Sequence, residues 1–189
     1  MTKGIKNLFK IAAITLLSIS TPGDDSALAK INNYIEDIKH YIIAAKQEAK
    51  KFNKHALIIV GEDHRYTPHS LYSNAIIQQT ASTQGIGVRY VEAKPYLLEL
   101  ILNRPRKVKT MSEEYLVPIA QQDLGMKVIG IENPNIPTKE NLSLEEEDQR
   151  ENYMIKKISQ ENTDAILITG GVHIKAFTEC PELNAISLS

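Results

Sequence analysis

The feature that most limits the fold of this chain is a short, continuously apolar run at residues 56–60 (ALIIV), which ends at Gly61. A run of this length with no polar position is typical of a strand that is buried on both faces. Strands of this kind occur in parallel sheets that are covered by helices on both sides. The run therefore favours an α/β fold over an all-helical or antiparallel one.

Short strands and helical segments alternate along the rest of the chain. The amphipathic spacing and the turn residues predict helices at residues 27–53, 68–83, 95–102, 112–124, 143–160 and 174–178. Further strands are predicted at residues 88–91, 127–131, 165–169 and 185–188. The pattern predicts a compact α/β fold with a mainly parallel sheet flanked by helices, and ligands binding beyond the carboxyl ends of its strands.

The N-terminus has the features of an export signal. Three lysines precede an apolar run at residues 11–19, and an Ala-Leu-Ala tripeptide that suits signal peptidase follows at residues 27–29. We expect a signal peptide at residues 1–29, a single domain at residues 30–189, and a periplasmic or secreted protein. The alternative is a cytoplasmic protein with an N-terminal leader. The apolar run is too short to be a stable membrane span.

Composition narrows the possible partners. The formal net charge of −1 gives no nucleic-acid footprint, and Cys180, the one cysteine, has no second thiol for a disulfide or a thiolate metal site. The expected partner is a small-molecule or peptide substrate. The oligomeric state is not fixed by the sequence.

Two Gly-x-x-His motifs close predicted strands, at residues 61–64 (GEDH) and 170–173 (GGVH). Gly61, Gly170 and Gly171 allow the backbone to turn sharply, and the N–H groups they leave exposed are able to bind an anion or an oxyanion. One such motif is weak evidence, because a glycine often ends a strand. Two motifs at the ends of buried strands favour a shared site.

Carboxylates also lie at the ends of predicted strands. Glu62 lies in the first motif, Glu92 follows the second strand, and Glu132 follows the third. In a parallel sheet these side chains share one edge with His64 and His173. A histidine near its ordinary pKa accepts a proton from water at neutral pH, and imidazoles with carboxylates also bind divalent metals. The candidate metal ligands are His64, His173, Glu62 and Glu92.

Arg150 lies one helical turn before Met154, at the edge of a predicted apolar stripe. An arginine at a buried edge needs an anionic partner, which would be Glu62, Glu92 or an anionic substrate. The alternative is an ordinary surface arginine that follows the acidic residues 145–148.

These residues resemble the superfamily that groups TraB/PrgY proteins, Tiki proteases, erythromycin esterases and ChaN-like haem-binding proteins. The resemblance covers roughly residues 56–189. His64 and His173 match the two motif histidines, Glu62 the acid of the first motif, Glu92 the intervening glutamate and Arg150 the arginine. The resemblance implies an EreA/ChaN-like α/β fold with these motifs on one edge of the sheet.

The resemblance implies several activities rather than one. Tiki-like members are metal-dependent proteases, which would need a divalent ion such as Mn, Co, Zn or Fe. Esterase-like members use a histidine as base on water without an obligatory metal, and ChaN-like members are associated with haem and iron. This chain lacks the ChaN-type lipid-anchor cysteine and has no room for large substrate-binding inserts.

The leading expectation is a hydrolase-like domain that cleaves an ester or peptide bond. His64 or His173 would activate water, directly or through a metal, while Glu62 would bind that metal or orient a histidine. Arg150 would hold an acidic group or the oxyanion. The alternatives are a ChaN-like haem- or iron-binding protein without turnover, and a degenerate fold used for interaction.

Overall fold

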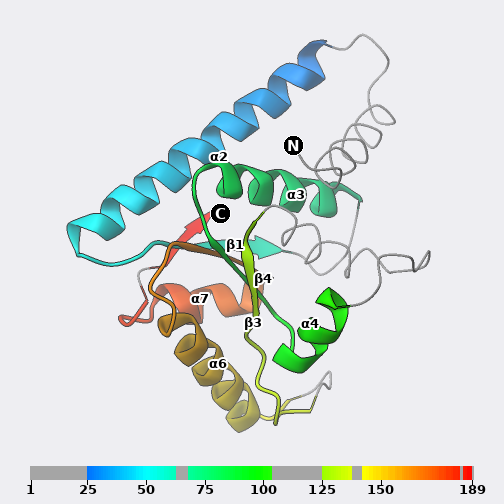
Figure 1. Ribbon diagram of the computed structural model, residues 1–189, viewed down its shortest axis with the longest axis vertical. Coiled ribbons are helices and arrows are strands. Elements are labelled where there is room, and N and C mark those ends of the chain that lie inside the picture. Colours follow the sequence, from blue (N-terminus) through cyan, green and yellow to red (C-terminus); the bar gives the residue numbers. More distant parts are fainter. Residues whose placement is uncertain (1–24, 63–67, 104–124, 138–141, 184, 189) are drawn as a thin grey trace.

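The computed structural model describes residues 25–62, 68–103, 125–137, 142–183 and 185–188 (Figure 1). The elements in chain order are α2 (Asp25–Lys51), β1 (Leu57–Glu62), α3 (Pro68–Thr83), β2 (Val88–Val91), α4 (Pro95–Leu102), β3 (Lys127–Gly130), α6 (Leu144–Ser159), β4 (Ala165–Gly170), a 3-10 turn (Gly171–His173), α7 (Ile174–Thr178) and β5 (Ala185–Leu188).

The strands form one sheet of five strands in the order β3-β2-β4-β1-β5, with every neighbouring pair parallel. Helices α2 and α3 lie on one side of this sheet, and α6 and α7 lie on the other (Figure 1). The predicted α/β fold with a parallel sheet and flanking helices is therefore confirmed.

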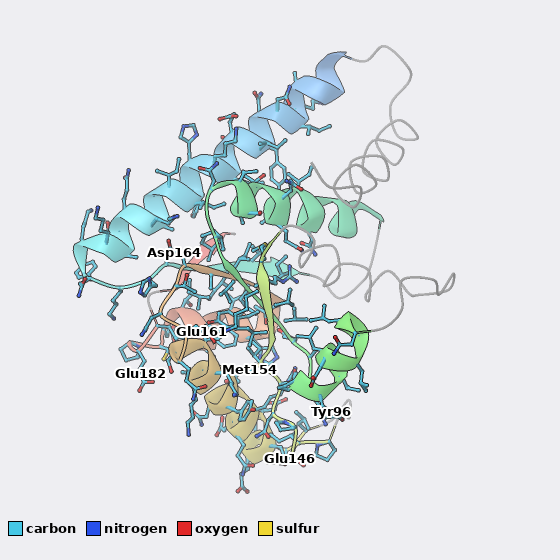
Figure 2. The ribbon with its side chains drawn as sticks, in the orientation of Figure 1. Tyr96, Glu146, Met154, Glu161, Asp164 and Glu182 are labelled. Atoms are coloured by element: carbon cyan, nitrogen blue, oxygen red, sulfur yellow. The ribbon has the colours of Figure 1, made fainter. Side chains whose placement is uncertain are left out.

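The apolar run of β1 packs against helices on both sides of the sheet, which explains why none of its positions is polar. Ile58 and Val60 belong to the core under α2 and α3, whereas Leu57 and Ile59 belong to the core under α6 and α7. Complete burial of such a side chain contributes about 1.5–3 kcal/mol. Figure 2 shows Met154, which is fully buried, in the layer between α6 and the sheet.

The strands β1 and β4 extend further than the sequence predicted. Glu62 is paired with Gly170 and Gly61 with Thr169, so the parallel ladder continues into the first residues of both motifs. Backbone hydrogen bonds do not depend on side-chain polarity, which is why the end of the apolar run did not mark the end of the strand. The two motifs leave the sheet side by side.

Helix α6 begins with a capping box. The Ser143 hydroxyl accepts a hydrogen bond from the Glu146 N–H, and the Glu146 carboxylate accepts one from the Ser143 N–H. From this start, Arg150 falls on the stripe that contains the buried residues Met154 and Ile158. The cap fixes where the helix begins, and the burial of Met154 and Ile158 turns the Arg150 stripe toward the sheet.

Close packing at the third strand holds α4 against the sheet edge. A Cβ atom on Gly130 would lie 2.6 Å from the Ala93 carbonyl oxygen and 3.1 Å from the Pro95 Cα. Backbone atoms cannot move aside as a flexible side chain does, so this position requires glycine. The contact fixes the two segments that carry Glu92 and Glu132.

Several predictions fall outside the described residues, namely the apolar run at residues 11–19, His64 and the helix at residues 112–124. Helix α2 begins at Asp25, so the proposed cleavage after Ala29 would fall inside it, and export stays a prediction. Within the described helices, none combines the length and apolarity that a bilayer crossing requires.

Candidate functional site

Five side chains meet at the carboxyl edge of the sheet, and we call them the strand-end cluster: Glu92, Glu132, Arg150, Glu151 and His173. Glu92 follows β2 and Glu132 follows β3, while Arg150 and Glu151 are consecutive residues of α6. His173 ends the 3-10 turn after β4. Residues distant in the sequence are therefore brought together by the parallel topology.

Arg150 and Glu132 form the central ion pair of this cluster. The Nε of Arg150 lies 2.9 Å from each Glu132 carboxylate oxygen, and its Nη2 also donates to Oε1. Only 22% of the Arg150 side chain and 15% of the Glu132 side chain are exposed. The hydrogen bonds that Arg150 donates to Glu132 raise the pKa of Arg150 above its ordinary value, so the guanidinium is a permanent cation.

Glu92 is held in a largely buried position. Its Oε1 accepts hydrogen bonds from the Thr169 hydroxyl and from the Gly170 N–H at 3.2 Å, and its Oε2 lies 3.6 Å from Arg150 Nη2. Burial raises the pKa of Glu92, although the guanidinium of Arg150 acts in the opposite direction. A carboxyl group of this kind exchanges its proton nearer to neutral pH than an exposed one.

His173 is buried and uses both ring nitrogens. Its Nδ1 lies 2.9 Å from Glu151 Oε1, and its Nε2 lies 3.2 Å from Arg150 Nη1. Arginine can only donate hydrogen bonds, so in this pair Nε2 is the acceptor. The neutral ring then carries its proton on Nδ1 and donates it to Glu151.

Arg150 was expected to pair with Glu62, Glu92 or an anionic substrate. It is largely buried and pairs with an acid at a strand end, so the surface interpretation is wrong, but this partner is not one of the two acids named. The principal partner of Arg150 among the described residues is Glu132, and Glu92 is only a more distant neighbour. Spacing within the sequence could not separate these acids, because the strand order of the sheet decides which of them lies nearest to α6.

The sequence suggested that the N–H groups of the motif glycines bind an anion, but the structure shows a different arrangement in the second motif. The Gly170 N–H is occupied by Glu92, so it is not available to a ligand in this arrangement. Gly171 is exposed, and a Cβ there would meet nothing within 4 Å. In the first motif, Gly61 continues the β1–β4 ladder. The Glu62 side chain and the whole of His64 lie outside what the structure describes, so a shared site of both histidines stays a prediction.

Sequence reasoning missed two members of the site and one supporting residue. Glu151 was passed over because the helical pattern singled out only Arg150, and Glu132 was noted as a strand end without a role. Thr169 was placed at the end of the strand at residues 165–169 and given no role, although it is completely buried and donates to Glu92. A threonine that ends a buried strand was the available signal, since its hydroxyl needs a partner there.

Two of the four predicted metal ligands, His64 and the Glu62 side chain, lie outside the described residues, so the metal site stays a prediction. His173 and Glu92, two of its proposed ligands, face the guanidinium of Arg150, which is 3.2 Å from Nε2 and 3.6 Å from Oε2. A divalent ion bound to both would lie beside this fixed cation. Within the described part of the chain, no cluster of three or more His, Cys, Asp or Glu residues has an arrangement suited to a metal ion.

Comparisons with known proteins assign no family. No family model and no curated protein matches this chain. One similar solved structure is RRSP, a MARTX toxin effector domain from Vibrio vulnificus CMCP6, with a TM-score of 0.47 and 13% sequence identity over 80% of this chain. The chain spans about a third, 34%, of the length of that structure. The function of this chain is therefore inferred from its own residues.

Proposed function

We propose that the chain is a hydrolase-like domain that activates water at the strand-end cluster and cleaves an ester or peptide bond. The observation that carries this proposal is the guanidinium of Arg150, held between Glu132 and His173 and beside the buried Glu92. The cluster lies at the carboxyl edge of a parallel sheet, where open α/β folds bind their ligands. In this cluster the positive charge of Arg150 lies beside Glu92 and His173, whose side chains are able to exchange protons.

Arg150 is the proposed oxyanion partner. A guanidinium has five N–H groups, and the hydrogen bonds to Glu132 and His173 use the one on Nε and one on each Nη. One further N–H on Nη1 has no hydrogen-bond partner among the described residues, whereas Nη2 also lies 3.6 Å from Glu92 Oε2. A preorganised cation in a partly buried site stabilises negative charge that develops on a carbonyl oxygen.

His64 is the proposed base. His173 is less suited to that role, because its Nε2 already accepts a hydrogen bond from Arg150 and its Nδ1 faces Glu151. His64 lies two residues beyond Glu62, which is paired with Gly170 at the end of the ladder, and this register supports a position near the cluster. Glu62 is the proposed orienting group for His64.

In the proposed reaction, water adds its oxygen to the carbonyl carbon and passes a proton to His64. The carbonyl oxygen becomes an oxyanion facing Arg150. As the tetrahedral intermediate collapses, the C–O or C–N bond breaks and the leaving group takes from His64 the proton that water gave up, which returns His64 to its neutral form.

No step of this reaction uses a metal or haem. A divalent ion (Mn, Co, Zn or Fe) or a haem iron on His173 Nε2 would displace the guanidinium of Arg150, and one on Nδ1 would displace the Glu151 carboxylate.

The test is turnover of a generic aryl ester and of a peptide library by the purified chain. We expect His64→Gln and Arg150→Met to abolish most of the turnover, and the exposed His55→Gln to leave it unchanged. Full activity in His64→Gln would contradict the proposed base. The absence of turnover with every ester and peptide would contradict the hydrolase function itself.

A further inference from the structure

Two consecutive residues of α6 contact the two ring nitrogens of one histidine. Arg150 Nη1 lies 3.2 Å from His173 Nε2, and Glu151 Oε1 lies 2.9 Å from His173 Nδ1. The same imidazole therefore separates a permanent donor from an anionic acceptor. These two contacts connect residues 150–151 of α6 to the histidine of the second motif.

The helix register makes this arrangement specific. Arg150 shares its stripe with the buried residues Met154 and Ile158, which anchor α6 against the sheet. Glu151 is the next residue, and 28% of its side chain is exposed. A small rotation of the helix would move both side chains away from the ring, so the packing of α6 keeps them at opposite nitrogens.

We infer that Glu151 is a positioning residue that fixes His173 in the Nδ1–H tautomer and thereby holds Arg150 in place. With the proton on Nδ1, the Nε2 lone pair accepts from Arg150. With the proton on Nε2, an N–H group would face the guanidinium N–H, and the two donors would repel each other. Arg150 would then keep its contacts with Glu132 and lose the contact on its other side.

This role deepens the proposed function and rests on it only for the catalytic consequence. Glu132 fixes the guanidinium through Nε and Nη2, and His173 fixes it through Nη1. The direction in which the remaining N–H groups point depends on both contacts. Glu151 reaches the reacting atoms through His173 and Arg150, so it is not itself a catalytic residue.

The tautomer can be measured without any substrate. Long-range nitrogen–carbon NMR spectra distinguish the two neutral forms of a histidine ring, and the signals of His173 are identified by their loss in His173→Gln. We expect the wild-type ring to carry its proton on Nδ1. A wild-type ring with its proton on Nε2 would overturn the inference without the need for a variant.

Substitutions of Glu151 then test the cause. Glu151→Ala removes the acceptor and should shift His173 toward the Nε2–H form, whereas Glu151→Gln keeps an amide oxygen and should retain the Nδ1–H form. Asp148→Asn removes a charge from an exposed position on the same helix and should change nothing. Retention of the Nδ1–H form in folded Glu151→Ala would also overturn the inference.

Turnover separates this inference from the proposed function. If the chain hydrolyses the test ester, Glu151→Ala should lower kcat by roughly a hundredfold with little change in KM, and Glu151→Gln should restore most of it. The expected tautomers without any turnover would leave the inference standing and remove the hydrolase function. An unchanged kcat in Glu151→Ala, despite a shifted tautomer, would overturn the catalytic consequence alone.

Discussion

The Nε of Arg150 lies 2.9 Å from both carboxylate oxygens of Glu132, a residue that follows a different strand and is 18 positions away in the sequence. This pair connects α6 to the end of β3. It also places a permanent cation at the carboxyl edge of the sheet, where Glu92 follows β2 and the second motif follows β4. The proposed chemistry and part of the stability of this edge depend on the same contact.

Arg150→Ala should lower the free energy of unfolding by about 3 kcal/mol, because it leaves Glu132 partly buried without a partner. Arg150→Lys should recover only part of this loss, since an ammonium group cannot make the planar two-pronged contact. The measurement is urea denaturation, with the exposed Lys156→Ala on the same helix as the control.

A double-mutant cycle identifies the partner. Arg150→Ala combined with Glu132→Gln should show a coupling larger than that of Arg150→Ala with Glu92→Gln, since Glu92 is 3.6 Å away and hydrogen-bonded elsewhere. Strictly additive effects in the Glu132 cycle would contradict the central ion pair.

Two glycine substitutions should differ in effect. Gly130→Ala places a Cβ 2.6 Å from the Ala93 carbonyl oxygen and should cost about 1–3 kcal/mol by forcing the start of α4 away from β3. Gly171→Ala meets nothing within 4 Å and should change stability by less than about 0.5 kcal/mol. Thermal denaturation of both variants measures the difference, and equal destabilisation would refute the packing argument.

The raised pKa of Glu92 predicts a specific pH dependence. Burial is its main cause, so the folded protein binds this proton more tightly than the unfolded chain, whose ordinary pKa is 4.5. The contribution of Glu92 to stability is therefore complete below the unfolded pKa and decreases as the pH rises through the higher folded value. Glu92→Gln cannot titrate and should lack this decrease.

The measurement is urea denaturation of wild type and Glu92→Gln at a series of pH values from acid to neutral. The wild type should lose stability relative to Glu92→Gln as the pH increases. The exposed Glu147→Gln serves as the control and should show no such trend. A wild type that gains stability relative to Glu92→Gln over this range would contradict the prediction.

Much of the fold could be predicted because its local signals are strong. The capping box at Ser143 and Glu146 marks the start of α6, and the apolar run of β1 marks a strand buried on both faces. These signals depend on neighbouring residues. Strand order does not, and the sequence alone did not indicate that β4 would lie between β1 and β2.

The candidate site was predictable only in part for the same reason. Parallel topology placed Glu92 and His173 at one edge, as the sequence suggested, but the choice of Glu132 as the partner of Arg150 depends on how α6 crosses the sheet. Glu151 was missed because contact with His173 needs the three-dimensional position of two segments 22 residues apart. The placement of His64 and of the export signal stays a prediction.

The hydrolysis that we propose at the strand-end cluster needs no metal. The measurement is the metal and haem content of untagged protein, together with ester or peptide turnover before and after treatment with a chelator. We expect no stoichiometric metal, no Soret band and unchanged turnover in the chelated protein. One metal ion per chain whose removal abolishes turnover and whose return restores it would overturn the metal-free reaction, as would a bound haem without turnover.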